Sequence, residues 1–175
     1  MARISLIDEN ATPDIAVLAG KIRGARGEFH VFYKALLHTP GLASAWFEFN
    51  NAVRFQTGLD ARTRELVIMR VSALTGCNYV WNVHQAKYAG PAGLTPQEIE
   101  ALRDWRKSGL YGGKERALLA YVDAMTQDVA VPDAVFDAMR KHFSEREILE
   151  LTVLTGAYNM QARLLRALDI QPDKA

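Results

Sequence analysis

Residues 64–90 read RELVIMRVSALTGCNYVWNVHQAKYAG, and this stretch decides the fold that we expect. Its first part follows Asp60, a good helix N-cap, and carries a helical apolar pattern that stops at Gly76. A second helical pattern begins directly afterwards, and neither part alternates with the period of two that is typical of a strand. The stretch therefore predicts a helical hairpin that turns at Gly76-Cys77.

Three chemically reactive side chains lie in this hairpin. Cys77 is the only cysteine of the chain, and His84 follows it by seven residues, or about 10 Å along a helix, which is too far for a hydrogen bond. Glu65 lies on the preceding helix, so an antiparallel hairpin brings its carboxylate toward His84. Because a carboxylate that orients an imidazole is a common acid–base arrangement, Glu65 and His84 are candidate catalytic residues.

Cys77 is the third candidate catalytic residue. It follows a glycine at the expected start of a helix, where unpaired N–H groups and the helix dipole favour a thiolate. A lone cysteine is nevertheless more often a small apolar core residue than a nucleophile. Equally ordinary interpretations apply to the others: His84 as a structural residue, Glu65 as a surface residue, and Tyr79 and Trp81 as core.

The remainder of the chain also reads as helical. A length of 175 residues, of which 49% are apolar, suits one domain with a substantial core. We expect an all-α single domain, residues 1–175, of about eight helices and no sheet. Two capping boxes, Thr95 with Glu98 and Ser144 with Glu147, mark helix starts. The helical patterns fall at 11–27, 28–41, 42–58, 59–76, 78–90, 94–109, 113–131, 131–143 and 144–170.

An internal similarity links residues 71–82, VSALTGCNYVWN, to residues 151–162, LTVLTGAYNMQA. Chance similarity of two amphipathic helices and a duplication of one helical hairpin explain it equally well. The second stretch has Ala157 where the first has Cys77, and Leu164 at the offset of His84. Packing alone therefore does not require a thiol or an imidazole in such a stretch.

Charge and composition exclude several function classes. A formal net charge of +1 gives no electrostatic case for a nucleic-acid partner. One cysteine cannot form an internal disulfide, which favours a reducing compartment. The first twenty residues contain acids and no unbroken apolar run, so we expect neither a signal peptide nor a membrane span, and a cytoplasmic location. No cluster of His, Cys and Asp has metal-ligand spacing, so no metal site is expected.

The stretch 64–102 resembles the core of the carboxymuconolactone decarboxylase and alkylhydroperoxidase D superfamily. That core has a glutamate, eleven residues, a Cys-x-x-Cys, three more residues and a histidine, and then a small-residue turn and a capped acidic helix. Glu65, Cys77 and His84 match these spacings, and GLTPQEIEAL at 93–102 resembles the segment that follows. The resemblance covers about residues 60–105 and implies this superfamily's all-α fold and a homo-oligomer, a trimer or a hexamer.

One position departs from both branches of the superfamily. Val80 stands where the peroxidase members carry their second cysteine and where many decarboxylase-like members carry an acid. A two-cysteine peroxidase needs one thiolate to attack the peroxide and a second thiol to resolve the sulfenic acid. The chain has only Cys77, so the resemblance to the peroxidase branch is incomplete.

The resemblance implies cofactor-free decarboxylation of a small carboxylated lactone or related acid as the first hypothesis. His84 would then be the proton donor and Glu65 its orienting partner. A thiol-dependent alkylhydroperoxidase that uses Cys77 is the alternative, and a non-enzymatic scaffold is the third. The candidates for an apolar substrate wall are Tyr79, Trp81, Phe47 and Phe55. The candidates to hold a substrate carboxylate are Arg54, Arg64 and Lys87.

Overall fold

Residues 2–172 are described by the structure, a computed structural model. Within these residues the chain forms nine α-helices and no β-strand. The expected all-α architecture is therefore confirmed for this part of the chain. None of the helices found there combines the length and the apolar character needed to cross a bilayer.

The helices follow one another with short connections. Two π-helical turns, Gln85–Ala89 and Ala124–Asp128, extend α5 and α7, and a 3₁₀ turn, Leu102–Lys107, extends α6. The α-helices are α1 (Pro13–Arg26), α2 (Val31–Leu36), α3 (Pro40–Phe55), α4 (Ala61–Thr75), α5 (Asn78–His84), α6 (Pro96–Ala101), α7 (Gly113–Asp123), α8 (Asp133–Arg140) and α9 (Glu145–Ala167).

Most helix starts follow the signals in the sequence. Thr95 and Ser144 both form complete capping boxes, and the Asp60 side chain accepts a hydrogen bond from the Thr63 N–H. One boundary differs from the expectation. Pro40 begins α3 instead of ending the preceding helix, because its missing N–H and its fixed φ suit the first helical position.

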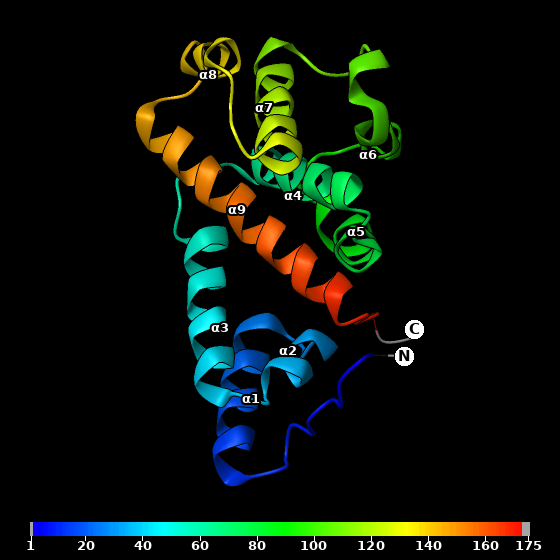
Figure 1. Ribbon diagram of the computed structural model, residues 1–175, viewed down its shortest axis with the longest axis vertical. Helices are drawn as coiled ribbons and strands as arrows, with labels where there is room; N and C mark the ends of the chain where they lie inside the picture. Colours follow the sequence, from blue (N-terminus) through cyan, green and yellow to red (C-terminus); the bar gives the residue numbers. More distant parts are fainter. Residues whose placement is uncertain (1, 173–175) are drawn as a thin grey trace.

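Two long helices, α4 and α9, form the centre of the molecule. α4 packs against α9, α5 and α7, and its run from Leu66 to Met69 is at most 1% exposed, as expected where four consecutive apolar residues cover all sides of one helical turn. α9 crosses the molecule, with α1–α3 on one side and α4–α8 on the other (Figure 1). One buried cluster contains residues of all nine helices, so both groups share a core.

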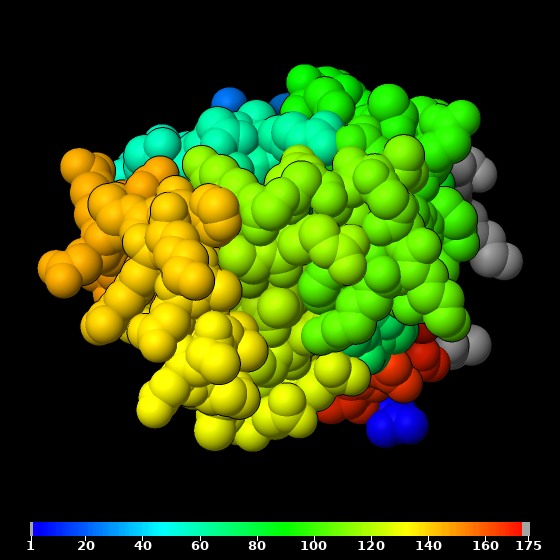
Figure 2. Space-filling view, turned by 90° about the horizontal axis from the view of Figure 1, so that it is seen from above, coloured from blue at the N-terminus to red at the C-terminus, as the bar shows by residue number. Residues whose placement is uncertain are grey.

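A buried ion-pair network ties α7 to α4. The Arg70 Nε donates to Asp123 Oδ1 at 2.6 Å, the Trp105 Nε1 donates to Oδ2 at 3.0 Å, and Arg106 also pairs with Oδ2. Arg70 and Asp123 are 5% and 2% exposed. The network belongs to the α4–α8 group, at the end of the molecule away from α1–α3. At this end α7 and α8 form much of the surface (Figure 2).

The turn between α4 and α5 confirms the predicted hairpin. Gly76 has φ +61°, and its N–H approaches the carbonyls of Ser72 and Ala73. Cys77 then leaves helical geometry and caps α5. Because this left-handed conformation strains residues with a Cβ, glycine suits the position at which the chain reverses.

The similar stretch in α9 contains no turn. α9 runs without interruption from Glu145 to Ala167, through Gly156. Two turning hairpins, as a hairpin duplication requires, are therefore absent, and the duplication hypothesis in that form is wrong. The difference has a local cause: Ala157, the best helix former, follows Gly156, whereas Cys77 follows Gly76.

This pair of glycines gives a matched prediction. We expect Gly76→Ala to lower the free energy of unfolding by about 1–2 kcal/mol, because alanine is strained at positive φ. Its Cβ would also lie 2.6 Å from Arg166 Nη1. Gly156→Ala is expected to raise stability by about 0.5–1 kcal/mol, since no atom outside its own helix lies within 4 Å of the added carbon. Urea unfolding of both variants checks this; similar changes in both would contradict it.

Candidate active site

The structure brings Glu65 and His84 into contact. The His84 Nδ1 lies 2.7 Å from Glu65 Oε2, and the two residues are 5% and 3% exposed. The predicted approach across the hairpin is thus confirmed. A carboxylate only accepts hydrogen bonds, so Nδ1 carries the proton and Nε2 presents its lone pair.

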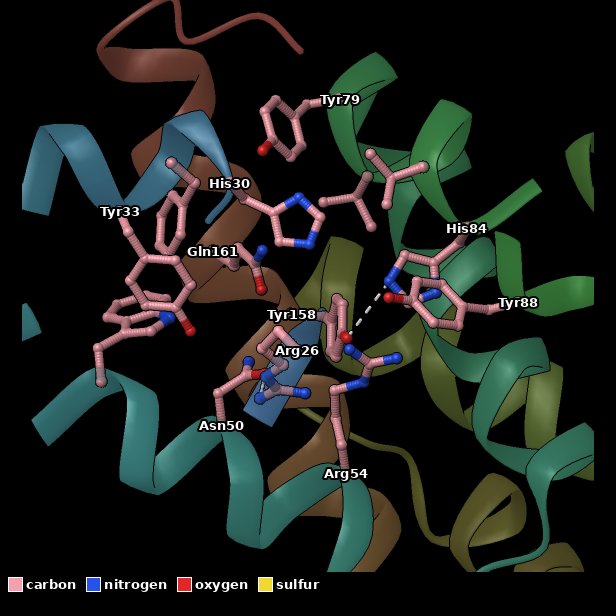
Figure 3. Close-up of a pocket in the computed structure, with 14 residues that line it drawn as sticks. Arg26, His30, Tyr33, Asn50, Arg54, Tyr79, His84, Tyr88, Tyr158 and Gln161 are labelled. Carbon is pink, nitrogen blue, oxygen red and sulfur yellow. Dashed lines mark hydrogen bonds between the residues drawn. The ribbon is translucent and has the colours of Figure 1, made fainter. Parts of the chain in front are cut away.

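The free nitrogen of His84 faces a tyrosine of α9. The Tyr158 hydroxyl lies 3.4 Å from His84 Nε2, as the dashed line in Figure 3 shows. Burial raises the pKa of Tyr158 to about 12, so the phenol keeps its proton at neutral pH. Burial also lowers the pKa of His84 below its usual 6.5, against the opposing effect of Glu65. At neutral pH, Nε2 is therefore a proton acceptor, and His84 donates only after it has taken up a proton.

His84 lines a cavity of about 50 Å³ between the α1–α3 group and the helices α5 and α9, with Glu65 behind it outside the lining. This volume is small beside the 300–1,000 Å³ of typical sites for drug-sized ligands, so the cavity suits a small ligand. Polar and apolar surface contribute about equally to its lining, and Figure 3 shows the polar side chains converging from both sides. The polar lining residues are Arg26, His30, Tyr33, Asn50, Arg54, Tyr79, His84, Tyr88, Tyr158 and Gln161.

A π-helical turn directly follows His84 and carries Tyr88. The Tyr88 ring centroid lies 5.0 Å from that of His84, and the Arg54 Cζ lies 4.7 Å from the Tyr88 ring. π-Helical turns inside helices are frequent at functional sites. This one places an aromatic ring between the imidazole and the guanidinium of the cavity.

Only one of the three basic candidates lines the cavity. Arg54, 7% exposed, contributes to its wall. Arg64 instead donates to the Leu59 carbonyl, and Lys87 pairs with Glu28 in a more exposed position. Local sequence does not distinguish the three, because the choice depends on how α3 packs against α5 and α9.

The aromatic candidates divide in the same way. Tyr79 lines the cavity, whereas Trp81 does not: it is buried elsewhere, with the Arg103 Cζ 4.0 Å from its ring. The assignment of Trp81 to the substrate wall is therefore not supported by its position. Phe47 belongs to the core, and Phe55 is 57% exposed, so neither forms the cavity wall.

Cys77 lies at the start of α5, as predicted, but in a different environment from the one expected. It is 2% exposed, and burial raises the pKa of its thiol, outweighing the backbone N–H groups of Tyr79 and Val80. The expectation of a favoured thiolate was therefore wrong in direction. Cys77 lines a separate hollow beside Arg166 and not the cavity of His84.

This burial predicts a slow thiol. We expect Cys77 in the folded protein to react with iodoacetamide at least roughly tenfold more slowly than in the urea-unfolded chain at the same pH, because burial limits both ionisation and access. Mass spectrometry of timed samples measures both rates. Equal rates, or faster labelling of the folded protein, would contradict the burial of this thiol.

Several cavity residues carry no signal in the sequence that marks them as functional. These are Tyr158 of α9, Arg26 of α1 and His30, the residue before α2, all far from the motif in the sequence. Each resembles an ordinary helix residue or helix cap.

Residues 2–172 contain no group of three or more His, Cys, Asp or Glu side chains placed to hold a metal ion.

Comparisons with known proteins show which family this chain belongs to. Residues 40–124 match the carboxymuconolactone decarboxylase family. A protein of unknown function from Agrobacterium tumefaciens, with a proposed antioxidant defence role as an AhpD, is 34% identical, with a TM-score of 0.74 over 79% of this chain and 94% of that one. The uncharacterized protein YnjA of Escherichia coli is 33% identical over 67% of this chain, and the match spans 64% of YnjA.

A third relative extends the likeness in fold to nearly the whole chain. An uncharacterized peroxidase-related protein from Silicibacter sp. superimposes with a TM-score of 0.83 at 22% identity, over 98% of this chain and 92% of that one. The chain belongs to the carboxymuconolactone decarboxylase family, within the superfamily that includes the AhpD-like proteins.

Proposed function

We propose that this protein is a cofactor-free acid–base enzyme that decarboxylates a small carboxylated lactone or a related acid. The observation that carries the proposal is the buried Glu65–His84 contact of 2.7 Å at the edge of a small cavity that also contains Arg54. A dyad of this kind moves protons, and a buried guanidinium binds a carboxylate.

The chemistry follows from these positions. The bond between the substrate and its carboxylate carbon breaks, carbon dioxide leaves, and the electron pair is delocalised into the conjugated ring. His84 Nε2, protonated from the bulk solvent before the reaction, transfers its proton to the carbanion and is reprotonated by the solvent, so that each turnover consumes one proton, while Glu65 stabilises the imidazolium. Arg54 orients the substrate anion. The protonated Tyr158 hydroxyl, close to Nε2, helps to position the imidazole relative to the substrate.

A thiol-dependent alkylhydroperoxidase is the second candidate, because the Agrobacterium relative carries a proposed antioxidant role. The position of Cys77 gives this candidate little support: the thiol is buried, its pKa is raised, and it lies outside the cavity of His84. The scaffold hypothesis would gain support from a wide separation of Glu65 and His84, and the two are in contact.

The test of the proposed function is a carbon dioxide release assay on carboxylated lactones and related small acids. The parent protein is expected to turn over at least one of them without added metal or cofactor, and His84→Ala is expected not to. Release that is equal in both proteins would remove His84 from the reaction. Thiol-dependent peroxide consumption without carbon dioxide release would favour the second candidate.

We also propose that the protein forms a homo-oligomer, a trimer or a hexamer. Leu149, Val153 and Met160 lie on one side of α9 and are 64%, 38% and 44% exposed. Leu42 and Phe49 of α3 are similarly exposed, at 53% and 41%. Exposed apolar residues that recur at helical spacing are typical of an interface.

Light scattering at micromolar concentration is expected to show this oligomer. Leu149→Glu is expected to shift it toward the monomer, because a charge in an apolar interface is costly. As a control, Glu100→Gln, at an exposed residue outside α3 and α9, should leave the mass unchanged. A parent protein that is monomeric at these concentrations would contradict the proposal.

A further inference from the structure

We propose that Arg26 and Arg54 form one binding site for a single carboxylate group, so that the ligand of the cavity is a small monocarboxylate held by two guanidinium groups. The inference rests on the proposed function only in treating this anion as the substrate. Arg26 lies in α1, outside the residues that match the family.

The two arginines are close together although they lie on different helices. Arg26 is the last residue of α1, and Arg54 is the penultimate residue of α3. Their Cζ atoms lie 4.9 and 4.8 Å from the centroid of the same ring, that of Phe55. Burial lowers the pKa of Arg26, and the charge of Arg54 lowers it further, as expected for two neighbouring cations.

Neither arginine has an ionic partner among residues 2–172. The Arg26 Nη2 donates to the neutral Asn50 Oδ1 at 3.1 Å, and Arg54 faces the phenol of Tyr88. Arg26 Nη1 and Arg54 Nε are buried without any hydrogen-bond partner. The Glu65 carboxylate interacts electrostatically with Arg54, but it is hydrogen-bonded to His84 and forms no ion pair with the guanidinium.

Two neighbouring cations that are largely buried without a counter-ion are costly, and an anion between them removes both the repulsion and the unpaired donors. A carboxylate offers two oxygens with about four acceptor positions, which is enough for donors from two guanidinium groups. The cavity of about 50 Å³ leaves little room for a second acidic group. The arrangement therefore fits one carboxylate on a small molecule.

The binding test needs no turnover. Isothermal titration of the parent protein with propionate, at constant ionic strength set with chloride, is expected to show saturable binding. Propionamide, which has the same shape without the charge, is expected not to bind. Phosphate and succinate serve as further probes. Failure of propionate to bind, or binding of phosphate or succinate at least tenfold tighter than propionate, would overturn the proposal of a monocarboxylate site.

Variants locate the site. Arg26→Gln and Arg54→Gln are each expected to weaken propionate binding at least about tenfold, as for the loss of a charge-assisted hydrogen bond. The matched control is Arg23→Gln, one turn earlier on α1, where Arg23 pairs with Glu9 outside the cavity; it should change affinity less than twofold. Undiminished binding by Arg26→Gln would overturn the two-arginine site. Circular dichroism confirms the helical content of each variant.

The outcome is separable from that of the proposed function. Binding without any carbon dioxide release would refute the decarboxylase proposal and leave the carboxylate site intact. If Arg26→Gln changed neither carbon dioxide release nor propionate affinity, the carboxylate site would be refuted and the decarboxylase proposal would stand.

Discussion

His84→Ala is expected to lower kcat/KM for decarboxylation by about 10²–10⁴-fold, the usual contribution of a positioned acid–base group. The variant removes the cavity imidazole that is bonded to the buried carboxylate of Glu65. The variant also leaves the buried Glu65 carboxylate without its partner, so some loss of stability is expected as well, and the kinetics are measured on protein that is shown to be folded. Steady-state kinetics, with circular dichroism as a check on folding, measures the effect.

Glu65→Gln tests whether the dyad acts as a unit. We expect a loss of similar order, because glutamine can hold the imidazole but cannot stabilise its protonated form. The double variant should then lose little more than His84→Ala alone, as is found for groups that act together. Full additivity of the two losses would show that Glu65 acts independently of His84.

The pH dependence has a defined sign. Burial lowers the pKa of His84 below 6.5, and the proton donor in the proposed reaction is its protonated form. The rate should therefore fall as pH rises through this lowered pKa, and the fall should begin below pH 6.5. A rate that instead rises with pH over this range would identify His84 as a base in the rate-limiting step.

Asp123→Ala is expected to produce the largest loss of stability, about 3–5 kcal/mol. The substitution leaves the guanidinium of Arg70 buried without its carboxylate and removes the acceptor of the Trp105 N–H. Breaking a buried pair on one side costs more than the pair itself contributes, because an uncompensated charge remains in the core. Urea unfolding at a fixed protein concentration measures the change.

A surface ion pair provides the matched control. Glu100 pairs with Arg103 at 3.0 Å, and both side chains are about half exposed or more. Glu100→Ala is expected to cost no more than about 1 kcal/mol, because water screens the pair. If Asp123→Ala cost no more than Glu100→Ala, the Arg70–Asp123 network would not be a major support of the fold.

The dyad could be predicted from sequence because it depends on local features. Asp60 and Gly76 define the limits of one helix, and an antiparallel return at Gly76 brings His84 back toward Glu65. These are short-range signals of caps and turns, which the sequence carries directly. The same signals predicted the all-α fold of the described residues.

The rest of the cavity could not be predicted, because it depends on how distant helices pack. Arg26 resembles any basic residue in a last helical turn, and Tyr158 resembles any core aromatic of α9. The state of Cys77 also depends on packing: a helix start favours its thiolate, but the burial supplied by neighbouring elements raises its pKa. Burial of this kind is not visible in local sequence.

A side-by-side assay of Cys77→Ser and His84→Ala tests most directly whether the proton chemistry belongs to the Glu65–His84 dyad. Carbon dioxide release from the best carboxylated lactone would be measured for the parent and for both variants under identical conditions. The dyad account predicts that Cys77→Ser retains activity within about threefold of the parent, whereas His84→Ala loses about 10²-fold or more. Loss of activity in Cys77→Ser together with retention in His84→Ala would contradict it.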